Sequence, residues 1–398
     1  MDTLWDIVIV GGGLGGLALA AELAAPQFAA LSVLVLEKRS QYVRDRTWSY
    51  WTTTPHRYSH LERHRWNQWT VSLGSTVHSQ CSQQSSYATL DADAFYNAAV
   101  NAIHTASHVV LRMDACVARM QVDGPSETVI TLAQGGSVRA RRVLDARPAP
   151  PCAASTLVQQ FAGWEINLPC DVFDASQVQL MSFRPNPHGL HFFYVLPYSA
   201  RCALVESTWV SPAQWQPDFE AELRHYIARE CGGADYSVSY REHGVLNLQE
   251  VPAQAAVEPV GLGRRGGTLR PSTGYAFTDT LAHAAQLAQS LSVALRAGTQ
   301  ATWQPAAFYR AATDTWMDAV FLEVLTQDWQ RAPDYFMPLF GAVEVADTVA
   351  FLTGQARWQQ RLRVMRSLPV APFARAALQH GFSGRRASQL ADRFFGAR

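Results

Sequence analysis

The chain has 398 residues, and its 33 basic and 33 acidic side chains give a formal net charge of zero at pH 7. Apolar residues make up 48% and charged residues 17% of the chain, which excludes an intrinsically disordered protein. The neutral balance argues against a nucleic-acid-binding protein, because such proteins carry a basic surface. The length predicts two or three subdomains around one large core.

Lysine and cysteine usage narrows the chemistry further. Lys38 is the only lysine, which excludes a P-loop lysine, and its position after a predicted buried strand argues against a Schiff-base lysine. The six cysteines are scattered without a CxxC pair or metal-ligand spacing, so we expect no metal site, no disulfide framework and reduced cytoplasmic thiols. The chain start lacks a basic export-signal region, and the apolar run near it is interrupted. We therefore expect a cytoplasmic protein that does not cross a membrane.

The N-terminal segment predicts a βαβ unit. Residues 4–10 form a short apolar run that predicts a buried parallel strand. The Ala- and Leu-rich segment 17–25 predicts a helix that ends at Pro26, and residues 31–36 predict a second buried strand. Strand, glycine-rich turn, helix and strand follow one another in the order of a βαβ unit.

A glycine motif lies in the turn of this unit. Gly11, Gly13 and Gly16 have the spacing G-x-G-x-x-G, and Glu37 ends the second strand. The first glycine permits the tight turn, the second lets a pyrophosphate approach the backbone, and the third lets the helix pack on the strand. The helix N-terminus favours the anion, and the acid accepts hydrogen bonds from a ribose. The pattern predicts a dinucleotide site that takes either FAD or NAD.

Further elements follow in chain order. Residues 91–103 predict a helix that begins at an acid. Alternating segments near 109–121 and 128–133 predict strands, and the Pro-rich residues 148–151 indicate a domain crossing. Helical patterning dominates from residue 278, with one broad apolar face over 308–325. A second sheet is predicted from strands at 177–184, 190–196 and 202–210.

Two later segments favour a flavin over NAD. Asp145 ends a buried strand, as where flavoprotein chains return to the cofactor. Pro271, Thr273 and Gly274 lie in a turn before a predicted helix. The N–H groups and the positive dipole at the start of such a helix can stabilise an anionic reduced flavin. Taken by itself, each segment fits an ordinary loop better than a flavin site.

These motifs together resemble the bacterial lycopene β-cyclases over nearly the whole chain. Arg46–Tyr50 is similar to the family's His-Thr-Trp-Ser-Phe segment, and Arg142–Arg147 is similar to its strand ending in Asp-Gly-Arg. Leu204–Thr208 resembles the family's Leu-Ile-Glu-Asp-Thr or Leu-Glu-Glu-Thr segment. Pro271–Tyr275 matches its Pro-(Ser/Thr)-Thr-Gly-Tyr motif.

The motifs and the resemblance predict an α/β flavoprotein with a Rossmann-type FAD-binding domain, a β-sheet substrate domain and a helical C-terminal part. The FAD-binding domain is expected in three pieces and the substrate domain in two. The expected boundaries are 1–55, 85–150 and 258–300 for the FAD-binding domain, 56–84 and 151–257 for the substrate domain, and 301–398 for the helical region.

The activity that the resemblance implies is that of a lycopene β-cyclase, an isomerase of the intramolecular lyase class. Such an enzyme closes the ψ ends of lycopene, or of a related linear carotene, into β-ionone rings. Reduced FAD is required but not consumed, with NADPH or another reductant as the electron source. By analogy with the family acid, Glu206 is the expected catalytic proton donor, held protonated by apolar surroundings. The expected cofactor-binding residues are Gly11, Gly13, Gly16, Glu37, Arg46, Asp145, Pro271, Thr273 and Gly274.

The charge distribution and the substrate together favour a membrane surface. Residues 355–398 hold nine Arg and one acid, a local charge of +8, which can favour an anionic bilayer. Because lycopene is insoluble in water, we expect peripheral membrane association through this region, including Trp358 and Leu362. The alternative is an ordinary solvated face.

The chain departs from the family pattern at two places. Ser207 stands where the family has a second acid, and Arg44–Arg46 replace a Gly-Asn-His type of turn. We therefore expect Glu206 to be the single proton donor. The alternative enzyme is a flavin monooxygenase or dehydrogenase acting on an apolar substrate, although the Gly-Asp signature of flavin hydroxylases is missing near Val260–Arg265. A carotenoid carrier without catalytic activity is the third hypothesis.

Overall fold

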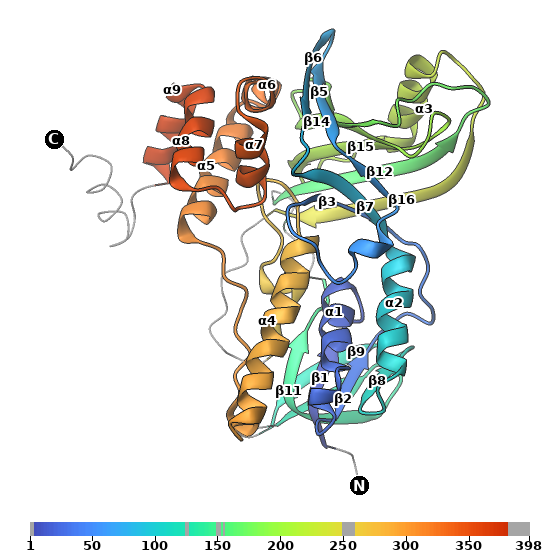
Figure 1. Ribbon diagram of the computed structural model, residues 1–398, viewed down its shortest axis with the longest axis vertical. Helices are drawn as coiled ribbons and strands as arrows, with labels where there is room; N and C mark the ends of the chain where they lie inside the picture. Colours follow the sequence, from blue (N-terminus) through green and yellow to red (C-terminus); the bar gives the residue numbers. More distant parts are fainter. Residues whose placement is uncertain (1–3, 124–126, 149–152, 154–155, 249–258, 381–398) are drawn as a thin grey trace, which may run out of the picture.

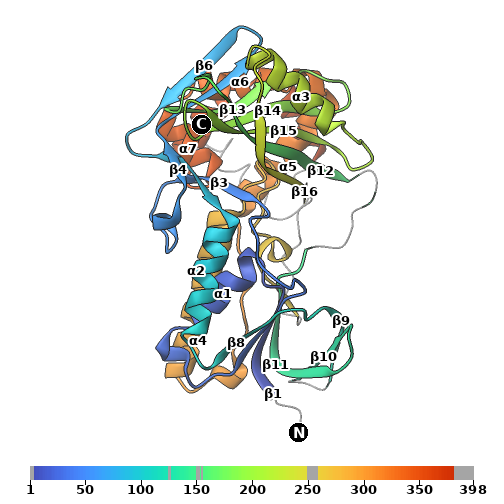
Figure 2. The same cartoon turned by 90° about the vertical axis from the view of Figure 1, so that its right-hand side faces the viewer.

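The computed structural model describes residues 4–123, 127–148, 153, 156–248 and 259–380. The molecule is elongated and has two halves (Figure 1). We call the half that carries the N-terminus the Rossmann half, and it contains the first sheet with α1, α2 and α4. The other half contains the second sheet and the helices α3 and α5–α9, and we call it the sheet half (Figure 2).

The first sheet has the strand order β8-β2-β1-β11-β10-β9, with β17 also paired to β11. The strands β8, β2, β1, β11 and β17 run parallel, whereas β10 and β9 extend the sheet in an antiparallel ribbon. The strand bounds are Leu4–Val10 (β1), Val33–Leu36 (β2), Val109–Arg112 (β8), Val117–Val122 (β9), Thr128–Leu132 (β10), Ser137–Asp145 (β11) and Val260–Gly261 (β17).

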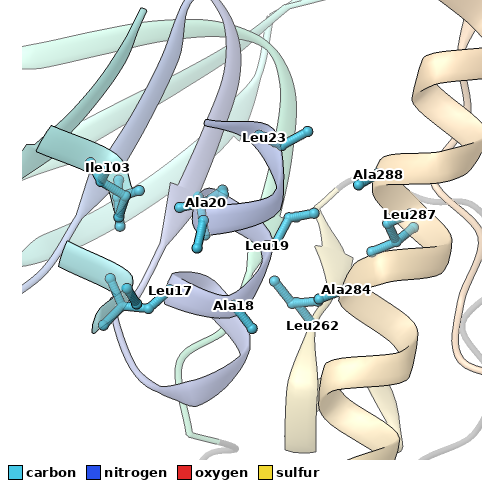
Figure 3. Packing of buried hydrophobic residues seen from close by; sticks show 14 of the residues in the cluster. Leu17, Ala18, Leu19, Ala20, Leu23, Ile103, Leu262, Ala284, Leu287 and Ala288 are labelled. Carbon is cyan, nitrogen blue, oxygen red and sulfur yellow. The ribbon is translucent and has the colours of Figure 1, made fainter. Parts of the chain in front are cut away.

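Apolar side chains cover both faces of this sheet, as the apolar runs predict. Ile7 and Ile9 of β1 belong to the core under the helices, while Val8 and Val10 belong to the core on the opposite face. Small residues let the helices pack closely, and Figure 3 shows Leu19 of α1 between Ala20 and the α4 side chains. The three helices are α1 (Leu14–Leu23), α2 (Ala92–His104) and α4 (Phe277–Arg296).

The second sheet has the strand order β16-β12-β15-β14-β13-β5-β6. Its neighbours are antiparallel except for β13 and β5, which run parallel. The strand bounds are Gln68–Leu73 (β5), Thr76–Cys81 (β6), Leu157–Asn167 (β12), Gln177–Phe183 (β13), Leu190–Pro197 (β14), Cys202–Pro212 (β15) and Ser237–Asn247 (β16).

Helices cover the two faces of the second sheet unequally. One face packs on α3 through Leu223 and Ile227, and the other packs on the C-terminal helices through residues such as Leu204 and Met337. The C-terminal helices lie together beside the sheet (Figure 1). The helix bounds are Phe219–Glu230 (α3), Ala312–Gln327 (α5), Pro333–Gly341 (α6), Val345–Leu352 (α7), Trp358–Ser367 (α8) and Val370–Gln379 (α9).

A three-stranded sheet joins the halves. Its strands are β3 (Thr47–Thr52), β7 (Ser86–Asp91) and β4 (His64–Trp66), in the order β3-β7-β4. Tyr50 belongs to the core of the Rossmann half, whereas its neighbour Trp51 belongs to the core of the sheet half. Strands from both predicted domains meet in this sheet, since β3 and β7 come from predicted FAD-binding pieces and β4 from a predicted substrate piece.

Two predicted elements differ from the structure. The helix predicted over 308–325 begins only at Ala312, because tertiary contacts hold the preceding segment. There the Arg310 guanidinium donates to the Thr268 carbonyl at 3.2 Å. The single strand predicted over 109–121 is divided into β8 and β9, and Asp114 between them has a φ of 54°. Of the predicted domain crossing at 148–151, residues 149–151 lie outside the described residues.

Three further properties concern the described residues. Among the helices there, none is long and apolar enough to cross a membrane. In the same ranges, no group of three or more His, Cys, Asp or Glu side chains is placed to hold a metal ion. The free thiols are Cys81, Cys116, Cys170, Cys202 and Cys231.

Candidate active site

The turn between β1 and α1 has the geometry of a phosphate cradle. A Cβ on Gly16 would lie 1.9 Å from the Gly11 carbonyl oxygen, and Gly11 has a φ of +100°, so larger residues do not fit at either position without strain. A Cβ on Gly13 would meet nothing within 4 Å. Gly13 is the N-cap of α1, and no side chain caps this helix. The open, uncapped helix start can accept an anion.

Two glycines outside the predicted motif, Gly15 and Gly263, approach each other closely beside this turn. A Cβ on Gly15 would lie 3.2 Å from the Gly263 Cα, and Gly263 has a φ of +63°. A Cβ on Gly263 would in turn lie 3.7 Å from Thr280 Cγ2 in the first turn of α4. The segment after β17 therefore lies between the N-terminal turns of α1 and α4. The two glycines are far apart in the sequence, and no local pattern pairs them.

Glu37 lies where the motif predicts, at the end of β2, and is 4% exposed. Its Oε2 accepts a hydrogen bond from the Gly12 amide at 2.6 Å, and its Oε1 accepts one from the Arg39 amide at 2.9 Å. A carboxylate has about four acceptor positions, so Glu37 keeps acceptor capacity for the hydroxyl groups of a ligand.

Arg46 and Arg39 extend the charges around Glu37. Arg46 donates to Asp45 at 2.9 Å, and Asp45 lies 3.6 Å from Arg39. The Arg39 guanidinium lies 5.3 Å from the ring centroid of Tyr96, and its Nη1 is buried with no hydrogen-bond partner. A buried donor without a partner points to a ligand atom, so Arg39, which no motif predicted, fits the site better than the half-exposed Arg46.

Asp145 lies at the end of β11 but is already engaged by two arginines. It accepts hydrogen bonds from Arg147 Nε at 2.9 Å and pairs with Arg265 Nε at 2.8 Å. Burial raises the pKa of Asp145, but the hydrogen bonds from both arginines outweigh burial and lower it. The carboxylate therefore orients two arginines, and the Asp145 carbonyl accepts from the Leu262 amide at 2.9 Å.

The turn that contains Pro271 and Thr273 connects the two halves. Gly274 has a φ of +72°, and a Cβ there would lie 2.5 Å from Gln159 Oε1 of β12. The turn leads directly into α4, whose N-cap has no side-chain hydrogen bond. The Thr273 hydroxyl accepts from the Tyr275 amide at 3.3 Å. The uncapped start of α4 thus follows directly after a turn that lies against β12, and the role of this turn in flavin binding stays a prediction.

Arg270, just before this turn, anchors it to the C-terminal helices. Its Nη2 donates to Asp318 of α5 at 2.9 Å, and both side chains are buried. Its Nη1 donates to the Phe351 and Leu352 carbonyls at the end of α7, at 2.6 and 3.0 Å. The Ser272 hydroxyl donates to Asp318 at 2.7 Å. No sequence motif predicted this buried ion pair.

Glu206 lies on the face of β15 that Leu204 and Val210 share, toward the core under the C-terminal helices. It is 8% exposed. Burial and, to a lesser extent, the nearby Glu242 raise the pKa of Glu206 to about 8, although the Thr208 hydroxyl donates to it at 2.5 Å. At neutral pH this carboxyl is protonated, which is the state that a proton donor needs.

A second buried carboxyl, Glu242 of β16, shares the face of Glu206. Glu206 and Glu242 both stand directly opposite Gly163 of the intervening strand β12. A Cβ on Gly163 would lie 3.3 Å from Glu242 Cγ and 3.5 Å from its Oε1, so the Glu242 side chain lies over the glycine. Burial raises the pKa of Glu242 to about 7, despite hydrogen bonds from Tyr240 and Thr47. We call Glu242, Gly163, Glu206 and Tyr194 the acid row.

Glu206 is not the only buried carboxyl on this face, because Glu242 lies beside it, and the role of Glu206 as the single proton donor stays a prediction. Ser207 lies on the opposite face of β15, where it donates to Glu222 at 2.6 Å and lies 3.1 Å from His191 Nε2. An acid at position 207 would therefore face α3 and not Glu206. No local motif marks Glu242, and only the register of β15, β12 and β16 reveals it.

Tyrosines connect the acid row to the turn before α4. Tyr194 stands opposite Glu206 on β14, and its hydroxyl donates to the Tyr87 hydroxyl at 3.0 Å. Tyr87 is hydrogen-bonded in turn to Tyr275, which ends the Pro271–Tyr275 turn. The buried carboxyls and the uncapped start of α4 therefore belong to one connected region.

A family model described as "Lycopene cyclase protein" matches residues 6–378, which include the glycine turn, the acid row and the turn before α4. The chain belongs to the lycopene cyclase family. This confirms the resemblance seen in the sequence motifs. None of the curated proteins compared with the chain matches it significantly.

Solved structures share the fold of this family member at low sequence identity. A geranylgeranyl bacteriochlorophyll reductase-like protein from Thermoplasma acidophilum is 13% identical, with a TM-score of 0.58 over 98% of this chain and 99% of that chain. The p-nitrophenol 4-monooxygenase PnpA from Pseudomonas putida DLL-E4 is 16% identical, with a TM-score of 0.57 over 97% and 100%. The flavin-dependent monooxygenase PieE, solved with FAD and substrate, is 14% identical, with a TM-score of 0.60 over 95% and 72%. The predicted flavoprotein fold is confirmed.

Proposed function

We propose that this protein is an FAD-dependent lycopene β-cyclase, which closes the ψ ends of lycopene or a related linear carotene into β-ionone rings without net redox change. The observation that carries the proposal is the buried Glu206 carboxyl, connected through tyrosines to an uncapped helix start. Family membership supports a carotene substrate. The shared fold of flavin-dependent enzymes supports FAD.

The residues at the β1–α1 turn fit FAD. The open space at Gly13 can admit a pyrophosphate, Glu37 retains acceptor positions for ribose hydroxyls, and the unpaired Arg39 Nη1 can donate to the ligand. When bound in its reduced state, with NADPH or another reductant as electron source, FAD supplies negative charge that stabilises a carbocation. The residues that would hold FAD are Gly11, Gly13, Gly16, Glu37 and Arg39, with Arg46, Asp145, Pro271, Thr273 and Gly274 around them.

Glu206 performs the acid step. Its O–H bond breaks as a new C–H bond forms at the terminal double bond of the ψ end, which leaves a tertiary carbocation. A second double bond of the same end attacks this cation and closes the ring, and loss of one ring proton to a carboxylate creates the ring double bond. The Thr208 hydroxyl, which donates to Glu206, stabilises the carboxylate as it forms. One proton enters and one leaves, so the mass is unchanged.

The surroundings of Glu206 keep water from the cation. Leu204 and Val210 flank Glu206 on its face of β15, and Trp51, Tyr87 and Leu248 belong to the same buried cluster. An unpaired charge in such surroundings is costly. The same burial therefore keeps Glu206 neutral before the reaction and makes a preorganised counter-charge necessary during it.

The outer C-terminal helices support peripheral association with an anionic membrane. Trp358 and Met365 of α8 and Val370 and Leu378 of α9 are exposed apolar residues, and the surrounding sequence is rich in arginine. Apolar side chains beside cations favour the interface of an anionic bilayer. Residues 381–398 of the predicted docking region lie outside the described residues. We propose a cytoplasmic enzyme that receives its water-insoluble substrate from the bilayer.

Anaerobic turnover tests the proposal. The purified protein, loaded with FAD and reduced with dithionite in the absence of oxygen, is incubated with lycopene in liposomes. A cyclase converts lycopene into a product of unchanged mass and altered chromatographic retention. A flavin monooxygenase would form no product here and would add an oxygen atom only once oxygen is admitted. A carrier would bind lycopene without forming a product. Either of these outcomes would contradict the proposal.

A further inference from the structure

Two carboxyls lie on one buried face, whereas the proposed chemistry uses only Glu206. Among the residues that the structure describes, neither Glu206 nor Glu242 forms an ion pair with a basic side chain. The charge of Arg44 lowers the pKa of Glu242, but Arg44 is paired with other acids. Its Nη2 lies 2.8 Å from Glu165 and 3.2 Å from Asp91. The two carboxyls of the acid row therefore lack the counter-ion that buried carboxylates normally require.

We propose that Glu242 is a positioning residue for the cyclisation, whose carboxyl acts across Gly163 to keep the proton on Glu206. The inference rests on the proposed function and deepens it, because it assigns a second residue to the same site. Glu242 does not touch the substrate in this scheme. It sets the protonation state of the group that does.

Gly163 makes the coupling of the two carboxyls possible. Neighbouring strands lie about 4.8 Å apart, so Glu206 and Glu242, two strands apart, would ordinarily be separated by an intervening side chain. At Gly163 there is none, and a Cβ there would come within 3.2 Å of Leu204 Cδ1 as well as 3.3 Å of Glu242 Cγ. The space that a side chain would fill is occupied by Leu204 Cδ1 and the stem of Glu242. Because residue 163 has no side chain, it does not screen one carboxyl from the other.

The remaining groups that face the pair do not neutralise it. They are tyrosine and threonine hydroxyls from six segments, together with the single arginine engaged elsewhere: Tyr194, Tyr240, Tyr87, Tyr275, Thr47, Thr208 and Arg44. Burial raises the pKa of each of these tyrosines, so they remain neutral donors. Two negative charges cannot both persist at close range in such surroundings, and the pair retains at least one proton.

The pH dependence of cyclisation tests the role of Glu242. Activity requires protonated Glu206, so it is present below the pKa of that group and is lost as the pH rises through it. Removing the negative charge in Glu242→Gln is expected to move this alkaline limb about one pH unit lower, with the rate at pH 6 close to that of the wild type. Glu242→Asp retains the charge, and its limb is expected to stay near the wild-type position.

Glu222→Gln is the matched control, because Glu222 is a partly buried carboxyl beside the same strand but on its opposite face. Its alkaline limb is expected to coincide with that of the wild type. An unchanged limb in a folded, flavin-binding Glu242→Gln protein would overturn the inference. A rate lowered equally at every pH would also overturn it, since that result indicates a purely structural role.

Infrared spectroscopy separates failure of this inference from failure of the proposed function. The C=O band of protonated carboxyls is titrated in the purified protein without carotene. In Glu242→Gln, the remaining Glu206 step is expected at lower pH than the higher of the two wild-type steps, because residue 242 then carries no charge. A Glu206 step that stays at the higher wild-type position would overturn the coupling even where no activity can be measured. Coupled steps in a protein that cyclises no carotene would instead overturn the proposed function, and with it the positioning role.

Discussion

The glycine turn of the Rossmann half and the acid row of the sheet half are built in opposite ways. The turn works through missing side chains, since a Cβ would clash at Gly16 and would fill the open space at Gly13. The acid row depends on the side chains of Glu206 and Glu242, whose pKa values are raised because they are buried without a basic partner. Substitutions in the turn should therefore affect folding and flavin binding, whereas substitutions in the row should affect proton chemistry.

Glu206→Gln should have the largest effect on activity. Loss of the general acid is expected to lower kcat about 1,000-fold, because positioned acids contribute roughly 10²–10⁴-fold. Flavin binding should be unchanged, since Glu206 belongs to the sheet half. The measurements are steady-state carotene conversion and fluorescence titration with FAD. A variant that retains more than a tenth of wild-type activity would refute the assignment.

Breaking the buried ion pair that anchors the turn before α4 should have the largest effect on stability. Asp318→Asn leaves the buried Arg270 guanidinium without its charge partner and is expected to lower the free energy of unfolding by about 3–5 kcal/mol. Urea unfolding monitored by tryptophan fluorescence measures the change. The paired replacement Arg270→Met with Asp318→Leu should recover much of this loss. A loss below about 1 kcal/mol in Asp318→Asn would show that the pair does not anchor the turn.

Two glycine substitutions test the backbone logic of the β1–α1 turn. Gly16→Ala places a Cβ against the Gly11 carbonyl, and we expect it to destabilise the protein by about 1–3 kcal/mol and to weaken FAD binding. Gly13→Ala meets no protein atom within 4 Å, so it should weaken FAD binding while leaving thermal unfolding of the apoprotein unchanged. Equal effects of the two substitutions on apoprotein stability would contradict this distinction.

Ser207→Ala should have the smallest effect on catalysis. Ser207 faces α3, so kcat is expected to stay within about twofold of the wild type, while loss of its hydrogen bonds to Glu222 and His191 should cost about 1 kcal/mol of stability. Product formation and urea unfolding measure the two quantities. A large fall in kcat with little change in stability would place Ser207 in the catalytic site after all.

The sequence was sufficient where one short segment contains the whole signal. Gly11, Gly13, Gly16 and Glu37 belong to a single βαβ unit, so their spacing predicts where they lie. A family motif indicates Glu206, and the sequence predicts its burial only through that resemblance. The fold class followed from the same local and family signals.

The remainder depends on contacts that spacing does not encode. Glu242 joins the site only because β12 and β16 pair in a register that places Gly163 between two acids. Gly263 approaches Gly15 through the return of the chain after β17. Residues 308–311 have helical periodicity, yet contacts such as that of Arg310 with Thr268 keep them out of α5. In each case, tertiary packing overrides or completes the local pattern.

Deuterium uptake during cyclisation tests the central claim, that a carboxyl proton starts the reaction, most directly. The reduced, FAD-loaded enzyme is equilibrated in D2O, given lycopene without oxygen, and the product is analysed by mass spectrometry. The account predicts one non-exchangeable deuterium for every ring that closes, because the Glu206 carboxyl carries solvent deuterium into a new carbon bond. A cyclised product without deuterium would contradict it.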